Sequence, residues 1–314
     1  MRIHLRSAIL PLIAAWALHP VSASAWTSDI NCEGGTNGAK LAEGGTTQFS
    51  STFSLSTYST AQAATGSESC KMGITAGSDG WGVFGATYSF PSNIGQGGQV
   101  WTRVSLFVPS GFNVNTNDGM LKFMRVHTAN SGGSNVGYHD LLISNPGLVN
   151  WSATLGNWTS SFVYNFEGAP NLIGVGKVGT NDIVQGKWET YEIYIKFDSV
   201  AKSSGGTGEV RIWKNNQLLL DSTKQATLAS SSDHSDGFYL FTYWNGNAPA
   251  TQSLYVDDVI IATDTPSNKD AAGNPCLCGP TPGGAVSAPP TSGGTSGGST
   301  TTAVPNPPTG VTVQ

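Results

Sequence analysis

Two basic side chains occupy alternate positions in a short apolar segment, Leu121–His127 (LKFMRVH). In a β-strand every second residue points to the same side. One predicted face therefore carries Leu121, Phe123, Arg125 and His127. Lys122 falls on the other face, with Met124 and Val126. A guanidinium binds a carboxylate through two parallel hydrogen bonds, and an imidazole is a frequent general base. The spacing indicates a site that holds an anionic ligand beside a proton-transfer group.

Two other predicted strands place an aromatic ring near a charge. In Val100–Val108 alternation puts Arg103 on the face that also holds Trp101. In Trp188–Phe197 the face with Tyr191 is interpreted as core, and Tyr194 lies on the opposite, polar face. Aromatic and basic linings suit an acidic sugar chain, so Arg103 and Tyr194 are substrate-binding candidates. The alternative for both is an ordinary solvent-facing surface with local ion pairs.

The tripeptide Tyr138-His139-Asp140 presents a phenol, an imidazole and a carboxylate in succession. Adjacent residues of a strand point to opposite faces, so the three cannot form a local triad. Tyr138 and His139 are kept as substrate-binding candidates. The alternative is a buried polar side chain with satisfied hydrogen bonds. His234, in a polar loop, is interpreted as solvated.

Several common catalytic patterns are missing. A retaining glycosidase needs two carboxylates about 5 Å apart, which laminarinase-type enzymes place in a Glu-x-Asp-x-x-Glu strand. None of the glutamates has this spacing. The nucleophile elbow Gly-x-Ser-x-Gly, the zinc motif HExxH and phosphate-binding loops are also absent. Common hydrolase chemistry is therefore disfavoured.

The elements that must position these residues are β-strands. Short apolar and aromatic runs alternate with Gly, Pro, Ser and Asn breakers, as is typical of a β-sandwich. The clearest predicted strands are 100–108, 121–127, 188–197, 209–213, 238–244 and 253–262. Amphipathic helical patterns are absent, so a parallel α/β sheet is improbable. We predict an all-β fold, an antiparallel sandwich formed by residues 26–279.

The two ends of the chain differ from this domain. Residues 1–25 have the basic start, apolar stretch and Ala23-Ser24-Ala25 cleavage site of a signal peptide. After Asp264 Pro, Gly, Ser and Thr dominate, which is typical of a linker, and residues 280–314 are predicted to form a flexible tail. We expect a protein secreted to the extracellular space or the periplasm.

Charge and cysteine content limit the partners. Removing the signal leaves 13 of the 15 basic side chains against 20 acidic ones, a net charge of −7. Nucleic acid and anionic membranes are therefore not expected partners. Four cysteines in an exported chain suggest disulfides. We predict Cys32 to pair with Cys70. The pairing of Cys276 and Cys278, with each other or elsewhere, stays open.

Several segments resemble the concanavalin-like jelly rolls of polysaccharide lyases that act on alginate and glucuronan. The resemblance lies in GWGVFG at 80–85, LKFMR at 121–125, GKWE at 186–189, YWNG at 243–246 and LYVDDV at 254–259. It spans most of residues 70–264. The strands Arg-x-Glu-x-Arg and Gln-Ile-His of one large alginate lyase family are absent.

The resemblance implies a concave sheet that binds a uronate chain, which the enzyme cleaves by β-elimination. On this basis the predicted catalytic residues are Arg125, His127 and Tyr243, with Lys122 and Trp244 binding substrate. Fixed cations would stabilise the charge that develops when the proton beside the carboxylate leaves. No cofactor is required.

Asp257 and Asp258 are candidates for a structural Ca²⁺, which prefers several oxygen ligands. The alternative for this acidic pair is one side chain in water and one hydrogen-bonded. We expect a monomer with an acidic polysaccharide as partner. Two other functions remain open: a carbohydrate-binding, lectin-like domain without catalysis, and a structural extracellular protein.

Overall fold

The computed structural model describes residues 25–113, 120–144, 162–166, 171–174 and 183–280. The predicted signal peptide and tail lie outside these residues, apart from their boundary residues Ala25 and Pro280. The described residues form antiparallel β-strands, and the only helical element among them is the short 3-10 turn η2 (Lys202–Ser204). The all-β prediction is confirmed.

The strands form two sheets. The first sheet has the order β13-β12-β11-β6-β15-β4-β3, with β1 paired to β15. Its strands are β1 (Thr27–Ile30), β3 (Ser56–Ser59), β4 (Ser69–Ile74), β6 (Gln99–Phe107), β11 (Trp188–Lys196), β12 (Glu209–Lys214), β13 (Gln217–Ser222) and β15 (Gln252–Ala262). The second sheet has the order β10-β9-β8-β7-β14-β5-β2. Its strands are β2 (Ser51–Thr52), β5 (Gly80–Gly95), β7 (Met120–Ala129), β8 (Asn135–Ser144), β9 (Phe162–Phe166), β10 (Asn171–Gly174) and β14 (His234–Trp244).

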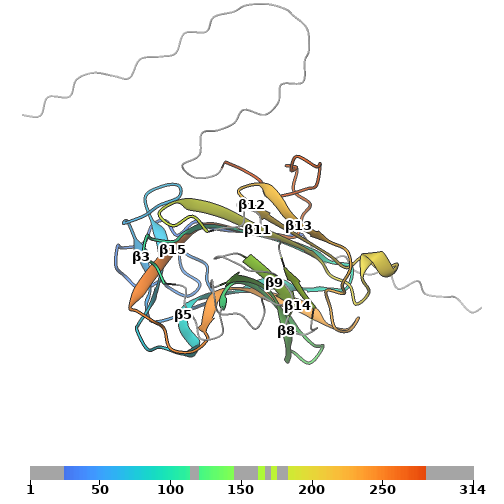
Figure 1. Ribbon diagram of the computed structural model, residues 1–314, viewed down its shortest axis with the longest axis horizontal. Helices are drawn as coiled ribbons and strands as arrows, with labels where there is room; N and C mark the ends of the chain where they lie inside the picture. Colours follow the sequence, from blue (N-terminus) through green and yellow to red (C-terminus); the bar gives the residue numbers. More distant parts are fainter. Residues whose placement is uncertain (1–24, 114–119, 145–161, 167–170, 175–182, 281–314) are drawn as a thin grey trace, which may run out of the picture. The chain divides into compact units, whose positions relative to one another are not determined.

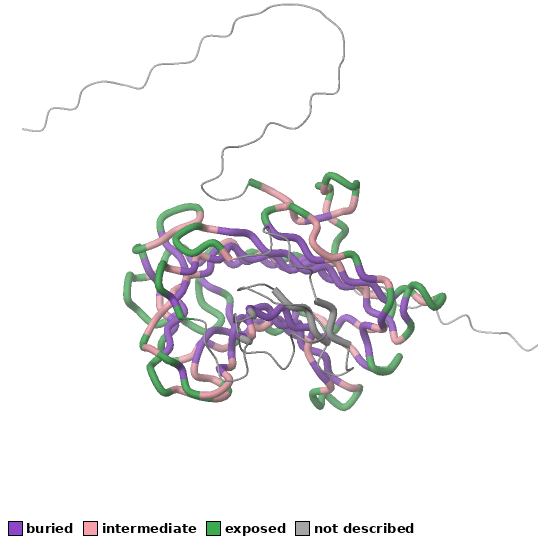
Figure 2. The backbone as a smooth tube through the Cα atoms, in the orientation of Figure 1, coloured by how far each residue is buried: buried purple, intermediate pink, exposed green. Residues whose placement is uncertain are grey.

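The sheets lie face to face and bend in the same direction, the first over the convex side of the second (Figure 1). Alternate side chains of both sheets fill the space between them. The backbone of the facing strands is accordingly coloured as buried in Figure 2. Tyr191 of β11 contacts Phe123 of β7 edge to face, with ring centroids 5.4 Å apart. The predicted core face of β11 is therefore confirmed.

A bulge in β7 changes the face pattern that simple alternation predicted. The pairing of β7 with β8 shifts register between Lys122 and Met124, which inserts Phe123 as an extra residue. Leu121, Phe123, Met124 and Val126 all join the core. The extra residue restarts the alternation, so Lys122 joins Arg125 and His127 on the outer side. The prediction that Leu121 and Phe123 share the face of Arg125 is wrong for this reason.

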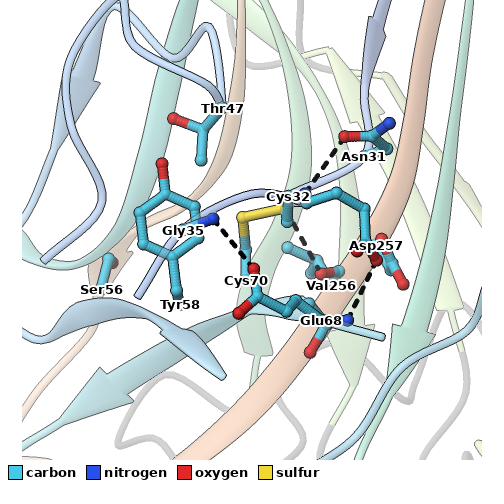
Figure 3. Close-up of a disulfide and its surroundings, with 12 residues drawn as sticks. Asn31, Cys32, Gly35, Thr47, Ser56, Tyr58, Glu68, Cys70, Val256 and Asp257 are labelled. Carbon is cyan, nitrogen blue, oxygen red and sulfur yellow. Dashed lines mark hydrogen bonds between the residues drawn. A yellow bond between two sulfur atoms is a disulfide. The ribbon is translucent and has the colours of Figure 1, made fainter. Parts of the chain in front are cut away.

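The disulfide Cys32–Cys70 fastens the segment after β1 to β4, with an S–S distance of 1.98 Å (Figure 3). It joins the two cysteines that the sequence analysis paired. The Glu33 carboxylate accepts hydrogen bonds from the backbone of Ser67 and Glu68, and Glu68 accepts one from Gly35. A bridge that closes a loop of this size typically stabilises by about 2 to 4 kcal/mol.

The segment Asn268–Pro280, here named the clasp, packs on the outer face of the first sheet (Figure 1). Its Cys276 and Cys278 form a second disulfide with an S–S distance of 2.07 Å. Cys276 is fully buried against the rings of Trp101, Tyr194 and Trp213, which form a core separate from that between the sheets. The interpretation of everything after Asp264 as a linker is therefore wrong, since this part of it is packed.

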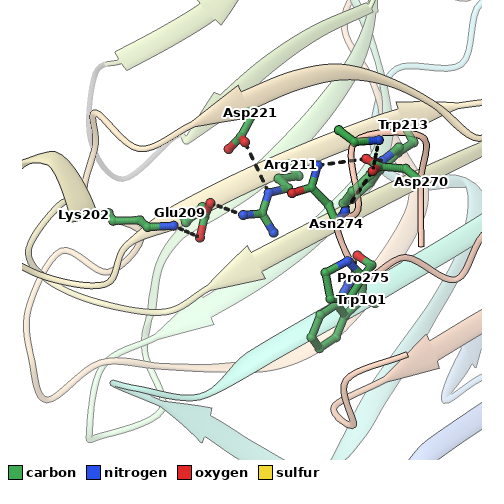
Figure 4. Close-up of polar contacts among 10 residues, drawn as sticks. Trp101, Lys202, Glu209, Arg211, Trp213, Asp221, Asp270, Asn274 and Pro275 are labelled. Carbon is green, nitrogen blue, oxygen red and sulfur yellow. Dashed lines mark hydrogen bonds and ion pairs between the residues drawn. The ribbon is translucent and has the colours of Figure 1, made fainter. Parts of the chain in front are cut away.

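Polar contacts hold the start of the clasp. The Trp213 indole donates to Asp270 at 2.8 Å, and the Trp101 indole donates to the carbonyl of Pro275 at 3.3 Å (Figure 4). Asp270 also accepts from Asn274, which closes the turn between them. Within the described residues no helix is long and apolar enough to cross a bilayer.

Candidate functional site

The outer face of the second sheet brings together the strongest candidates. It is named here the His127 face and is defined by Trp81 of β5, Lys122, Arg125 and His127 of β7, Tyr138 of β8 and Tyr239 of β14. Strand pairing sets the neighbours: His127 lies opposite Tyr138, and Arg125 lies between Tyr239 and Asp140. The sequence analysis predicted Arg125 and His127 as catalytic residues and Lys122 and Tyr138 as substrate-binding residues, and the structure places all four on this face.

Arg125 is held in a buried ion pair. Its Nε donates to Asp140 Oδ1 at 2.7 Å and its Nη2 to Oδ2 at 3.5 Å. The Tyr138 ring covers the guanidinium, with Cζ 3.8 Å from the ring centroid, and Nη1 donates to Thr242 at 3.4 Å. Arg125 is only 2% exposed. It therefore acts as a fixed charge beneath the surface rather than as an open binding arm.

His127 is oriented by a carboxylate on the neighbouring strand. Nδ1 lies 2.5 Å from Asp236 Oδ1. Asp236 sits where β14 shifts register between Ser235 and Gly237, and this bulge aims the carboxylate at the ring. Because an ionised carboxylate only accepts hydrogen bonds, Nδ1 carries the proton. In the neutral ring, Nε2 is then left as the basic nitrogen.

Tyr239 stacks on the His127 ring, with centroids 5.4 Å apart and planes 13° apart. Gly237 makes this possible, because it lies opposite His127 and a Cβ there would meet the Tyr239 ring at 3.0 Å. Burial raises the pKa of Tyr239 to about 12, helped by Tyr138 and Asp236 and opposed by Arg125. The phenol therefore stays protonated at neutral pH.

Lys122 of β7 and Tyr243 of β14 adjoin this cluster. The Lys122 ammonium sits 4.6 Å from the centroid of the Tyr243 ring. Tyr243 is the cross-strand partner of Trp81, and the Trp81 ring contacts Tyr239 at 5.7 Å. An unbroken row of rings thus runs across the strands from Trp81 to Tyr138.

Two predicted binding residues belong to the interior. His139 is fully buried, its Nε2–H donates to the carbonyl of Thr227 at 2.8 Å, and its ring contacts Phe197, the residue after β11. Burial lowers its pKa to about 4, so it is neutral at physiological pH. Trp244 is also fully buried, against Phe84. Neither side chain can contact a polysaccharide, because strand alternation turns both into the core.

Two further candidates lie on the opposite side of the sandwich. Arg103 donates to the carbonyls of Leu277 and Pro280, so its charge holds the clasp. Tyr194 packs on Trp101 with ring centroids 4.5 Å apart. The prediction that Arg103 and Tyr194 bind substrate is wrong because the chain's own C-terminal segment covers both.

The acidic pair of β15 does not fit a calcium ion. Asp257 is fully buried and accepts hydrogen bonds from the backbone N–H groups of Ala64, Thr65 and Asp258. Asp258 accepts from the Thr65 hydroxyl. Ca²⁺ requires oxygen ligands, whereas these carboxylates face donors. The described residues contain no cluster of three or more His, Cys, Asp or Glu suited to a metal. Burial raises the pKa of Asp257 to about 7.

Three members of the site were missed by the sequence analysis: Trp81, Asp236 and Tyr239. Tyr239 could have been found from alternation. A regular strand over Phe238–Trp244 places it on the same face as Tyr243, which was a predicted site residue. Asp236 lies outside the predicted strand, and its direction depends on the bulge. Glycines stand on both sides of Trp81 in the sequence, and glycine within a strand often indicates an unusual backbone conformation.

No protein-family model and no curated protein matches the sequence. Solved structures do. An endo-β-1,4-glucuronan lyase from the fungus Trichoderma reesei superposes with a TM-score of 0.50 at 13% identity, covering 76% of this chain and 95% of the other. A mutant of the alginate lyase Aly36B in complex with alginate trisaccharide gives 0.51 at 12% identity, covering 75% and 97%. The fold is that of the jelly-roll polysaccharide lyases, as the resemblance in sequence implied.

Proposed function

We propose that the protein is an exported polysaccharide lyase that cleaves a uronate-containing chain by β-elimination at the His127 face. The observation that carries the proposal is the stacked pair of His127 and Tyr239, one oriented as a base and the other kept protonated.

The chemistry follows from the two rings. Nε2 of His127 takes the proton from C5 of a uronate, and the electron pair forms the C4–C5 double bond as the bond from C4 to the bridging oxygen breaks. The Tyr239 hydroxyl gives its proton to that leaving oxygen. The products are a new chain end and an unsaturated uronate, so atoms and charge balance.

Fixed cations support this step. Loss of the C5 proton spreads negative charge onto the uronate carboxylate, which nearby positive charges stabilise. Lys122 is partly exposed on the same face, and its charge adds to the field there. Arg125, buried against Asp140, contributes through the field beneath Tyr138 and Tyr239.

Export supports a polysaccharide outside the cell as the substrate. The N-terminal sequence has the features of a signal peptide, and the structure contains two disulfides, which persist in oxidising compartments. The known structures with this fold include proteins whose names specify glucuronan and alginate as substrates. Polymers of uronates are therefore the first substrates to test.

One observation favours a second function. Asp140 offsets much of the Arg125 charge within a buried pair, which weakens the cationic field that an elimination needs. A lectin-like domain that binds an acidic glycan on the same rings, without turnover, is the alternative.

The test is a screen of residues 26–314 against glucuronan, alginate, pectate, heparin and a neutral glucan. The ultraviolet absorbance of the unsaturated uronate reports elimination, and calorimetry reports binding. We expect absorbance to rise with one uronate polymer and not with the neutral glucan. Binding of an acidic glycan without any rise overturns the lyase function in favour of the lectin-like one. Absence of both overturns both.

A further inference from the structure

Trp81 is the most exposed large apolar side chain of the described residues, at 50%. The others are Leu55, Val184 and Val200, and all three lie in connections between strands, whereas Trp81 lies in β5. Its indole is fixed on two sides, edge to face with Phe53 at 5.9 Å and with Tyr239 at 5.7 Å. A large ring that is both held in place and half exposed is preorganised to stack on a ligand.

The backbone around Trp81 is distorted on both strands. Gly80 and Gly82 have φ of 92° and 80°, in the left-handed region that glycine tolerates. On the facing strand, Phe241 and Thr242 have φ of 61° and 60°, at a register shift between β14 and β5. Such a conformation is costly for bulky or β-branched residues and clusters at functional sites. Two adjacent strands therefore depart from regular geometry where Trp81 and Tyr243 are displayed.

A positive charge lies next to this ring. Tyr243 is opposite Trp81 in the strand pairing, and the Lys122 ammonium lies over the Tyr243 ring at 4.6 Å. Trp81 thus offers an apolar surface for the C–H face of a sugar. Lys122, over the ring of the residue paired with Trp81, offers a charge for a carboxylate. Together they match a uronate ring, which has one apolar face and one anionic group.

We propose that Trp81, Tyr243 and Lys122 form a second sugar-binding subsite, which takes a uronate unit of the chain whose cleavage site lies at His127. The proposal rests on the proposed function for the polymer but not on turnover. Trp81 lies on β5, two strands from His127 on β7, or roughly 10 Å at the usual strand spacing. A polysaccharide that uses both places must cross the strands, and short fragments cannot fill both.

The subsite also changes the role of Tyr243. The sequence analysis predicted this residue as catalytic, yet the ring near the His127 imidazole is that of Tyr239. Tyr243 is instead the cross-strand partner of Trp81, and the Lys122 ammonium lies over its ring. Its contribution is to hold the ammonium beside the stacking surface, which makes it a positioning residue in this proposal.

The experiment compares the wild type with Trp81→Ala and Trp81→Phe, titrated calorimetrically with glucuronan and alginate oligosaccharides from two to eight units. Trp81→Ala should weaken binding of the longest fragments roughly tenfold, the change expected when one aromatic contact is lost. Binding of the shortest fragments should change less than twofold, and Trp81→Phe should retain most of the affinity. Trp188→Ala, at a partly exposed tryptophan of β11 in the other sheet, is the matched control and should bind like the wild type.

The outcomes separate the subsite from the catalytic proposal. Equal affinities of wild type and Trp81→Ala for all lengths, with elimination retained, overturn the subsite alone. Length-dependent loss on Trp81→Ala in a protein that forms no unsaturated product supports the subsite and overturns the lyase function. A wild type that binds none of these fragments overturns both. Thermal unfolding of each variant shows whether the fold is intact.

Discussion

The outer faces of the two sheets carry similar residues but differ in how the chain covers them. The first sheet presents Trp101, Tyr194 and Trp213 with Arg103 and Glu192, and the second presents Trp81, Tyr138 and Tyr239 with Arg125 and His127. The clasp buries the first set, whereas the second keeps its most exposed ring half in solvent. Aromatic and basic residues on a strand face are therefore not sufficient to identify a binding site.

What separates the two faces is the source of their polar partners. Arg103 and Glu192 bond to the backbone of the clasp: Arg103 donates to carbonyl oxygens, and Glu192 accepts from the Leu277 N–H at 2.6 Å. Arg125 and His127 instead bond to the side chains Asp140 and Asp236. Backbone partners cover the first face with chain, whereas on the second face side-chain partners orient Arg125 and His127, which are 2% and 7% exposed.

The largest expected effect is on turnover at the His127 face. His127→Ala should reduce elimination by about 10² to 10⁴, the range of general acid–base catalysis, and leave binding of oligosaccharides within a few fold. The product's ultraviolet absorbance gives the rate. His234→Ala, at the start of the same strand that holds Tyr239, is the control and should turn over normally. Equal rates for the two variants would remove His127 from the mechanism.

The next effect concerns stability. Asp140→Ala leaves the buried Arg125 charge unpaired, which should lower the free energy of unfolding by about 3 to 5 kcal/mol in denaturant titrations. The double variant Arg125→Leu with Asp140→Leu should recover much of this loss but none of the turnover. Recovery of turnover by the double variant would show that the pair has no part in the chemistry.

A smaller effect concerns the pH dependence of the free energy of unfolding, which Glu192 controls where it contacts the clasp. Burial raises the pKa of Glu192 to about 8, opposed by the Leu277 N–H and Arg103. The folded protein thus keeps a proton that the unfolded chain loses near pH 4.5, so stability falls as pH rises from 4.5 to 8. Glu192→Gln lacks this loss and should gain a few kcal/mol relative to wild type between pH 4 and pH 9. A difference in melting temperature that is constant with pH would contradict this.

The smallest effect is expected from the second disulfide. Cys276→Ser with Cys278→Ser opens a very short loop, which should cost roughly 1.5 kcal/mol of unfolding free energy. Turnover on a polysaccharide should be unchanged, because the clasp lies across the sandwich from His127. Loss of turnover without loss of stability would show that the two outer faces are coupled, which contradicts their independence.

The parts of the structure that follow local rules were predictable. The alternation of apolar and polar residues predicted the sandwich and the placement of Arg125 beside His127. The four cysteines in an exported chain predicted the pair Cys32–Cys70. Two bulges were not predictable, because an extra residue in one strand is defined by its partner strand. They moved Lys122 to the outer side and aimed Asp236 at His127. The clasp was missed because its composition resembles a linker, and its order comes from contacts with Trp101 and Trp213 far earlier in the chain.

The clasp also decides how the domain responds to a pull on its C-terminal end. Gly279 exchanges hydrogen bonds with the Asn216 side chain, and Arg103 donates to the Pro280 carbonyl. Force that arrives along the chain from residue 281 onward is therefore borne first by these contacts and by the ring closed at Cys276–Cys278. β15, which pairs with β1, β4 and β6, is loaded only after they break. The clasp therefore has to leave the first sheet before such a force reaches the strands of the sandwich.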